Sequence, residues 1–255
     1  MNVLVEARGV VKEYGTGHRV VDDVSFSIRQ GETLGLVGES GSGKSTVARI
    51  LLRLVEPTAG EVHYGGRDLL AAGPREMREM RRCMQIVFQD PFAALNPRMK
   101  VREILAEPFA IHQETPAEGL RVRLEAMLRS VGMDGSALER FPHEFSGGQR
   151  QRINIARALA LKPEFLVLDE PVSALDVSVG AQVVNLLRDL QREYGLTYLF
   201  ISHSMPLVRY LCDRVAVMQR GRLVEFGECE QVCSAPREQY TRRLIEATPE
   251  MPVGA

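Results

Sequence analysis

Short apolar runs alternate along the chain with stretches whose apolar residues recur at helical spacing. Four runs are continuously apolar, as expected of strands buried on both faces of a parallel sheet. They are Thr33–Val37, Gln85–Phe88, Phe165–Asp169 and Thr197–Ser202. The segment Val20–Ile28 instead alternates polar and apolar residues, which predicts an antiparallel strand. The pattern as a whole predicts an α/β fold with a mainly parallel core sheet covered by helices.

The domain organisation is predicted to be a single domain over residues 1–255 with an internal insertion. Residues 1–89 and 158–228 form the α/β core together with an N-terminal antiparallel β subdomain. Residues 90–157 are rich in Arg, Glu and Met and carry helical patterns, which predicts an inserted α-helical subdomain. Residues 229–255 are left as a C-terminal tail.

Composition and charge argue against nucleic-acid-binding, membrane-spanning, secreted and disulfide-rich proteins. The chain is 45% hydrophobic and 25% charged with a net charge of −1, so the charge balance gives no reason to expect a nucleic-acid partner. No segment approaches the ~18–20 apolar residues of a membrane span, and the N-terminus lacks the pattern of a signal peptide. The protein is therefore expected in the cytoplasm, reaching a membrane only by docking on another chain. Its four cysteines are too few for a disulfide framework and are expected to be reduced.

A glycine-rich stretch, GESGSGKST at Gly38–Thr46, follows the first buried strand and precedes the helical pattern Thr46–Leu54. It fits the phosphate-loop pattern G-x-x-x-x-G-K-[ST] in the strand-to-helix context that the pattern requires. Glycines let the backbone curl so that successive N–H groups face an anion, and the following helix adds its positive end. Lys44 is expected to reach the β- and γ-phosphates of ATP, and the Ser45 hydroxyl to bind Mg²⁺.

The third buried strand ends in Asp169 and is followed at once by Glu170. Asp169 at the strand tip suits a contact to Mg²⁺ through water. Glu170 points elsewhere, since successive strand residues alternate faces, and it is placed to orient or deprotonate an attacking water. Alone, the pattern is as typical of a solvated strand end, and the phosphate loop upstream favours the catalytic interpretation.

The stretch FSGGQRQR, Phe145–Arg152, resembles the signature loop of the ABC transporter ATPases. Further positions extend the resemblance in the family's order. Gln89 resembles the Q-loop glutamine, Ser173–Asp176 the D-loop and His203 the switch histidine, while Tyr14 stands where the family places an aromatic that stacks on adenine. The resemblance implies the ABC ATPase fold, which is a P-loop, RecA-like core with an antiparallel β subdomain and a helical insertion.

The resemblance also implies roles for single residues. Catalysis is expected from Glu170, His203, Lys44 and Gln89, and Mg²⁺ is expected on Ser45, Gln89 and Asp169. The residues expected to contact nucleotide are Tyr14, Gly38, Glu39, Ser40, Gly41, Ser42, Gly43, Lys44, Ser45, Thr46, Gln89, Asp169, Ser146, Gly147, Gly148, Gln149 and Asp176. In this family the signature loop of one subunit closes over the ATP of the other, so a dimer with two shared sites is implied.

Three stretches resemble one branch of the family, the importer ATPases for peptides and nickel. They are Gln89–Met99, Glu139–Pro163 and Gln239–Pro249. This implies an assembly with two transmembrane permeases, a second ATPase subunit, identical or paralogous, and indirectly an extracytoplasmic binding protein, with the chain peripheral on the cytoplasmic face of the membrane. Longer members carry a cysteine-rich extension linked to an iron–sulfur cluster. Cys229 and Cys233 do not match its pattern, so no cluster is expected.

Peptide import is the leading interpretation, and uptake of nickel or of a metal–chelator complex by the same importer family stays open. An exporter ATPase is the nearest rival outside the branch. A non-enzymatic relative would be marked by loss of Lys44, Glu170 or His203, which are all present. One departure stands beside them: the family usually has Asp after the switch histidine, and this chain has Ser204.

Overall fold

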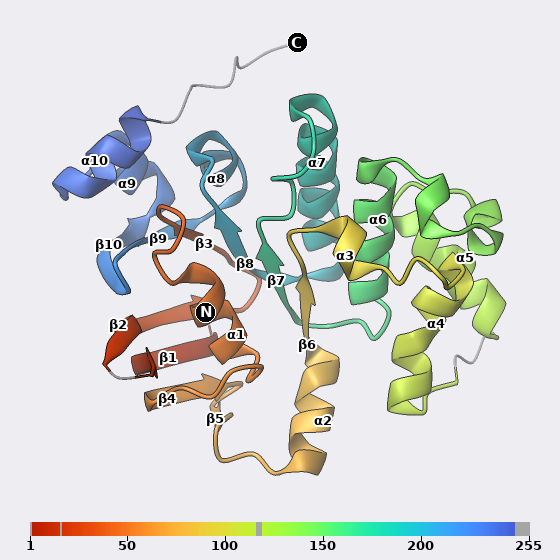
Figure 1. Cartoon of the computed structure of the whole chain (residues 1–255), viewed down its shortest axis with the longest axis horizontal. Helices are drawn as coiled ribbons and strands as arrows, with labels where there is room; N and C mark the ends of the chain where they lie inside the picture. The colour runs from red at the N-terminus through yellow and green to blue at the C-terminus, as the bar shows by residue number, and fades with distance from the viewer. Residues whose placement is uncertain (1, 16, 116–118, 248–255) are drawn as a thin grey trace. The chain divides into compact units, whose positions relative to one another are not determined.

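The computed structural model describes residues 2–15, 17–115 and 119–247. The chain forms two compact units, one from Met1–Met77 with Thr197–Ala255 and the other from Arg78–Leu196 (Figure 1). Within the described residues, no helix has both the length and the apolar character that crossing a bilayer needs.

The first unit contains an antiparallel sheet with strand order β2-β1-β4-β5. Its strands are β1 (Val3–Tyr14), β2 (His18–Arg29), β4 (Ala59–Tyr64) and β5 (Arg67–Asp68). In β2 the buried side chains include Val24, Phe26 and Ile28, with exposed residues between them, because alternate side chains of a strand point to opposite faces. The predicted antiparallel strand at 20–28 is thereby confirmed.

The second sheet of this unit joins strands that are far apart in the sequence, in the order β10-β9-β3-β8. They are β3 (Thr33–Val37), β8 (Thr197–Ser202), β9 (Arg214–Gln219) and β10 (Arg222–Glu228). The strand β3 runs parallel to both β8 and β9, and every residue of β3 and β8 is buried. This burial is why both strands have continuously apolar sequences.

The helices of the first unit are short. They are α1 (Lys44–Leu51), α8 (Met205–Leu211), α9 (Cys229–Ser234) and α10 (Gln239–Glu246). The stretch left as a tail thus contains α9 and α10, and its last residues, 248–255, lie outside the described residues. In α9 the thiols of Cys229 and Cys233 lie one turn apart, with 3.8 Å between the sulfur atoms.

The second unit joins two parallel strands to a set of helices. The strands are β6 (Met84–Val87) and β7 (Phe165–Asp169). The helices are α3 (Pro91–Ala94), α4 (Val101–His112), α5 (Leu120–Ser130), η1 (Gly135–Glu139), η2 (Pro142–Glu144), α6 (Gly147–Ala158) and α7 (Val177–Tyr194). The helix α2 (Pro74–Cys83) runs across the division between the units. The α/β fold class predicted from the sequence is confirmed, with the parallel strands and the antiparallel sheet both present.

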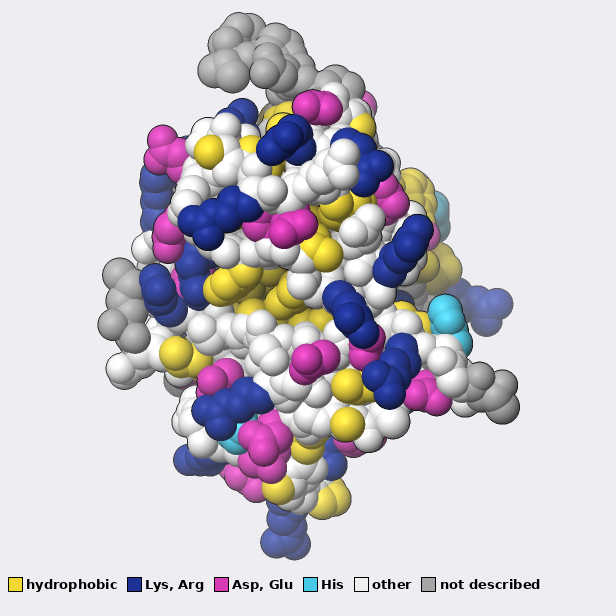
Figure 2. Space-filling model, turned by 90° about the vertical axis from the view of Figure 1, so that its left-hand side faces the viewer, with side chains coloured by type: hydrophobic (Ala, Val, Ile, Leu, Met, Phe, Trp, Pro, Cys, Tyr) yellow, Lys and Arg dark blue, Asp and Glu magenta, His cyan; other side chains and the backbone are white. Residues whose placement is uncertain are grey.

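Charged side chains of both signs are interspersed over the face drawn in Figure 2, with hydrophobic side chains between them. No field of a single sign covers that face, in keeping with the net charge of −1.

One ion pair of the first unit is buried. Arg214 at the start of β9 donates two hydrogen bonds to the Glu32 carboxylate, 2.7 Å and 3.0 Å long, and a third to the carbonyl of Ser27. Glu32 also accepts the backbone N–H of Arg29. Because both charges are withdrawn from water, each depends on the other for compensation.

Removing one member of this pair should therefore cost much of the protein's stability. Arg214→Ala leaves the Glu32 carboxylate buried without its cation, and the free energy of unfolding should fall by about 3–5 kcal/mol. Chemical denaturation followed by circular dichroism measures this. Arg8→Ala, which removes an exposed arginine paired with Glu6, should leave the unfolding midpoint close to that of the wild type. Equal midpoints for the two variants would contradict the prediction.

Candidate functional site

The glycine-rich loop connects β3 to α1, as the sequence predicts, and two of its glycines lie where no side chain fits. A Cβ on Gly38 would lie 2.2 Å from the Met218 carbonyl oxygen, and one on Gly43 would lie 2.5 Å from the Val20 carbonyl oxygen. Both glycines also have positive φ, 150° and 105° respectively. The loop is thus pressed against the backbone of neighbouring strands, which only glycine permits at these two positions.

Lys44 lies inside this loop and is only 5% exposed. Its ammonium group donates 2.7 Å hydrogen bonds to the carbonyl oxygens of Gly38 and Glu39 and a longer one to the Ser42 hydroxyl. The loop is held in turn by Gly221, whose N–H donates to the Ser42 carbonyl. The cation therefore stands at the centre of the curled backbone, where an anion bound by the loop would meet it.

His203 is brought to the same sheet edge as the loop. The pairing of β3 with β8 sets Val37 opposite Ser202, so that the two strands end together. Gly38 and His203 each follow directly, and His203 is exposed. Ser204 begins α8 without capping it through its side chain, and its N–H donates to the Ser202 hydroxyl.

The second unit repeats this arrangement with acidic and amide side chains. The pairing of β6 with β7 sets Val87 opposite Leu168, so the residues that follow each strand are neighbours. Gln89 lies two residues beyond the end of β6 rather than in the strand, and its side-chain N–H donates to a Glu170 carboxylate oxygen at 3.1 Å. Asp169, the last residue of β7, is buried.

The backbone of Glu170 has φ 47°, in the left-handed region that residues with a side chain seldom adopt. The carbonyl of Glu170 accepts two hydrogen bonds from Ser173, one from the hydroxyl and one from the N–H. The turn after β7 therefore fixes an unfavourable conformation, a kind of strain that is concentrated at functional sites.

The SGGQ stretch forms the start of α6. The Ser146 hydroxyl accepts the Gln149 N–H, and the Gln149 side-chain oxygen accepts the Ser146 N–H, which makes a capping box. The glycine at position 148 is required by packing, because a Cβ there would lie 2.3 Å from a Val179 methyl group at the start of α7. The helix that begins in this stretch runs from Gly147 to Ala158.

Asp176 caps the next helix, α7. Its carboxylate accepts the N–H of Val179 and the hydroxyl of Ser178, each at 2.9 Å. These hydrogen bonds hold the pKa of Asp176 below its ordinary value, with the Val179 N–H contributing most. The carboxylate is thus used within its own chain to start α7.

The segment after Gln89 packs against α6, the helix that begins in the SGGQ stretch and is called the signature helix below. The Arg157 guanidinium of α6 donates to the Ala94 carbonyl at 2.8 Å, and the Arg150 guanidinium lies 4.1 Å from the centre of the Phe92 ring. Within this unit, α3 and α6 are therefore tied together by two arginines of α6.

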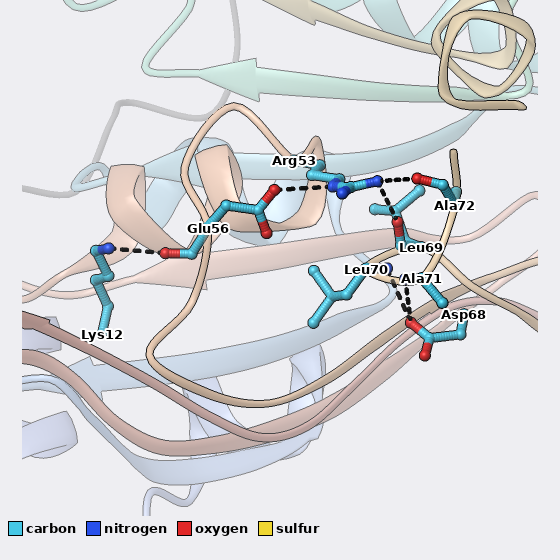
Figure 3. Close-up of polar contacts among 8 residues, drawn as sticks. All are labelled: Lys12, Arg53, Glu56, Asp68, Leu69, Leu70, Ala71 and Ala72. Carbon is cyan, nitrogen blue, oxygen red and sulfur yellow. Dashed lines mark hydrogen bonds and ion pairs between the residues drawn. The ribbon is translucent and has the colours of Figure 1, made fainter. Parts of the chain in front are cut away.

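Tyr14 ends β1 with its side chain 47% exposed. The Lys12 ammonium lies 4.9 Å from the centre of the Tyr14 ring. It also donates a hydrogen bond to the Glu56 carbonyl (Figure 3). The Glu56 carboxylate is held by Arg53, which also donates to the carbonyls of Leu69 and Ala72 (Figure 3). A network of hydrogen bonds thus fixes the cation beside the Tyr14 ring.

A loop with this strand-to-helix setting and a central lysine defines the class of P-loop nucleotide-binding proteins. The ABC transporter family matches residues 21–173, so the chain belongs to that family. The chain is 51% identical over 247 residues to the oligopeptide transport ATP-binding protein OppF of Bacillus subtilis. The matched region covers 96% of this chain and 79% of OppF.

Solved structures agree with this assignment. The cbiO1 protein of Clostridium perfringens, part of the ABC transporter complex cbiONQ, has a TM-score of 0.83 and 26% identity, and the match covers 92% of each chain. The ATP-binding cassette MJ0796, solved as a dimer in a post-hydrolysis state bound to ADP and Pi, has a TM-score of 0.79 and 29% identity over 89% of this chain and 99% of that one. The chain is thus an ATPase of the ABC family, and the predicted resemblance is confirmed.

Substituting Gly38 should disrupt the loop, because the added Cβ meets a backbone carbonyl that cannot rotate away. Gly38→Ala is expected to lower the free energy of unfolding by about 1–3 kcal/mol, the range for inserting a methyl group into a packed site. ATP binding, followed with a fluorescent analogue, should be lost.

Gly73→Ala is the matched control, since a Cβ there meets nothing within 4 Å and the residue is not in the left-handed region. That variant should bind ATP as the wild type does. Wild-type affinity in Gly38→Ala would mean that the close approach to Met218 is not needed for binding.

Proposed function

We propose that this chain is the ATP-binding and ATP-hydrolysing subunit that powers an ABC importer for peptides. The similarity to an oligopeptide transport ATP-binding protein, at 51% identity over 96% of the chain, carries the proposal. Lys44, Glu170 and His203, which an active ATPase of this family needs, are all in place.

The chain works in this proposal with two transmembrane permease subunits and a second ATPase subunit, identical or paralogous. It lies on the cytoplasmic face of the membrane and receives cargo indirectly from an extracytoplasmic binding protein. The two ATPase subunits close when ATP binds and part after hydrolysis. The helical subdomain, which contains residues 89–99, transmits this motion to the permease. The two arginine contacts between α3 and α6 support this role, because they make that segment move with the signature helix.

ATP binds with its phosphates in the Gly38–Thr46 loop and its adenine on the exposed ring of Tyr14. Lys44 exchanges its 3.3 Å hydrogen bond to the Ser42 hydroxyl for one to a phosphate oxygen, which is a stronger acceptor because it is charged, while the Gly38 and Glu39 carbonyls continue to hold the ammonium group. The Lys12 ammonium beside the Tyr14 ring keeps that aromatic in place.

Mg²⁺ would be held by the Ser45 hydroxyl, the Asp169 carboxylate and the Gln89 side-chain carbonyl. These are the hard oxygen donors that this ion prefers, and a carboxylate as buried as Asp169 gains from a nearby cation. When bound, the ion would neutralise charge on the phosphates.

Hydrolysis depends on Glu170, which orients the attacking water and accepts its proton. The Gln89 N–H fixes one carboxylate oxygen of Glu170, and the strained backbone at Glu170 sets the direction of its side chain. His203 is placed to contact the γ-phosphate. The partner subunit supplies Ser146, Gly147, Gly148 and Gln149 to the same ATP, and the neighbouring Asp176 shapes that loop by starting α7.

Replacing Glu170 by glutamine should preserve ATP binding and remove turnover. The amide cannot accept a proton from water, so single-turnover hydrolysis by Glu170→Gln should fall by about 10²–10⁴-fold. Glu164→Gln makes the same change at the other end of β7 and should hydrolyse ATP normally. Hydrolysis by Glu170→Gln at the wild-type rate would contradict the assignment.

The same variants test the cargo in cells. A strain that lacks this chain should lose uptake of labelled oligopeptide, and wild type or Glu164→Gln should restore it, whereas Glu170→Gln should not. Uptake of radioactive nickel is measured in parallel. Loss of nickel uptake with normal peptide uptake would replace peptide import by metal import.

The shared site makes a prediction about assembly. In the Glu170→Gln background, MgATP should convert the chain to a dimer, alone or with its paralogous partner, because ATP bridges the two subunits. Ser146→Arg should prevent this by placing bulk and charge at the start of α6, without affecting ATP binding at the chain's own loop.

Ser136→Arg is the control, since it makes the same substitution in an exposed turn of the same unit. Sedimentation with and without MgATP should give a dimer for Ser136→Arg and a monomer for Ser146→Arg. A closed dimer in the Ser146→Arg chain would disprove the shared site.

A further inference from the structure

The C-terminal helix α10 reaches the phosphate loop through a single side chain. The hydroxyl oxygen of Tyr240 accepts the backbone N–H of Glu39 at 3.0 Å, from 201 residues along the chain. Tyr240 is 7% exposed and Glu39 is exposed, so this hydrogen bond is partly shielded from water. Glu39 belongs to the first unit together with α10.

The peptide group between Gly38 and Glu39 is hydrogen-bonded to Tyr240 through its N–H and to Lys44 through its carbonyl. The N–H of Glu39 and the carbonyl of Gly38 belong to the same planar unit. That carbonyl accepts the Lys44 ammonium at 2.7 Å, while the N–H donates to Tyr240. A peptide group bonded on both sides cannot rotate without breaking both bonds, and hydrogen bonds in series strengthen each other.

The position of this peptide group makes such a restraint useful. Gly38 has φ 150° and no Cβ, so its own conformation resists rotation less than any other residue would. Glu39 is exposed, and the hydrogen bonds described above involve its backbone N–H and carbonyl groups. The orientation of the Gly38 carbonyl, and with it one acceptor of Lys44, thus depends on the bond to Tyr240.

The helix that carries Tyr240 is itself fixed at its start. The Glu225 carboxylate of β10 accepts the N–H groups of Arg237 and Glu238, 2.8 Å and 3.2 Å away. Arg237 and Glu238 are the two residues that directly precede α10, so these bonds fix the chain where it enters the helix, and a carboxylate near this end interacts favourably with the helix dipole. Tyr240 follows within the first turn, so its hydroxyl is presented to the loop from an anchored element.

We propose that Tyr240 is a positioning residue for ATP binding, which fixes the Gly38–Glu39 peptide and keeps the phosphate loop in the shape that binds nucleotide. The inference rests on the proposed role of this loop in binding ATP. A loop that is shaped in advance pays less conformational entropy on binding, so the hydroxyl acts on affinity. The Tyr240 hydroxyl acts through the Glu39 N–H, a backbone group of the loop, so kcat should not depend on it.

Tyr240→Phe tests this by removing one oxygen and keeping the ring. In the full chain, the affinity for a fluorescent ATP analogue with Mg²⁺ should fall by about threefold to tenfold, the effect of one hydrogen bond. KM for ATP should rise by the same factor with kcat unchanged. Hydrogen exchange at the Glu39 amide should become faster while the amides of α10 keep their protection.

A merely structural role gives a different result: a lower unfolding midpoint with unchanged KM and unchanged exchange at Glu39. Tyr194→Phe is the control, a tyrosine of the other unit whose hydroxyl is hydrogen-bonded to side chains. It should leave affinity and KM as they are.

The proposal is overturned if Tyr240→Phe keeps wild-type affinity for the ATP analogue and wild-type hydrogen exchange at the Glu39 amide.

Lys44→Ala separates this inference from the proposed function. If Lys44→Ala abolishes nucleotide binding while Tyr240→Phe binds as the wild type does, the loop is the ATP site and the role of Tyr240 is refuted. If Lys44→Ala binds ATP normally, the loop is not the phosphate site, and the proposed function fails with it.

Discussion

In-register pairing of parallel strands positions the candidate site residues of this protein, which follow the ends of those strands. Parallel neighbours present their carboxyl ends at the same edge, so whatever follows them in sequence is brought together. Val37 opposite Ser202 puts the phosphate loop and His203 at one edge of the first unit. Val87 opposite Leu168 does the same for Gln89 and Glu170 in the second unit. A shift of either register by one residue would turn these side chains to the wrong face.

Backbone contacts then complete what the strands begin. Gly38 and Gly43 are pressed against the carbonyls of Met218 and Val20, so the loop has a shape that its own sequence only allows. Lys44 lies within that shape on the carbonyls of its own loop. The same principle holds at the signature, where Gly148 gives room to Val179. In both places glycine is needed for the close approach of another element.

Two polar contacts of the first unit join groups that are far apart in the sequence. Arg214 and Glu32 form a buried ion pair, and the Tyr240 hydroxyl accepts the N–H of Glu39. Such groups are costly alone and contribute little net stability when paired, but they specify one arrangement among several. The glycine-rich loop is thus in contact with α10 through Tyr240, which lies 201 residues further along the chain than Glu39.

The sequence alone determined the chemistry and the class. Continuous apolar runs located β3, β7 and β8 to the residue, and β6 to within one, because burial on both faces leaves no other pattern. Motif spacing predicted the phosphate loop at Gly38–Thr46, the catalytic role of Glu170 and the signature loop, since these functions need those residue types at those distances along the chain. Tertiary structure decided the rest: that Gln89 contacts Glu170, that Asp176 caps α7, and that Tyr240 holds the loop. These pairs are 81, 3 and 201 residues apart. The cap alone follows a local rule. Contacts between distant residues leave no periodic signal, because they arise only when the packing of whole elements fixes the direction of each side chain.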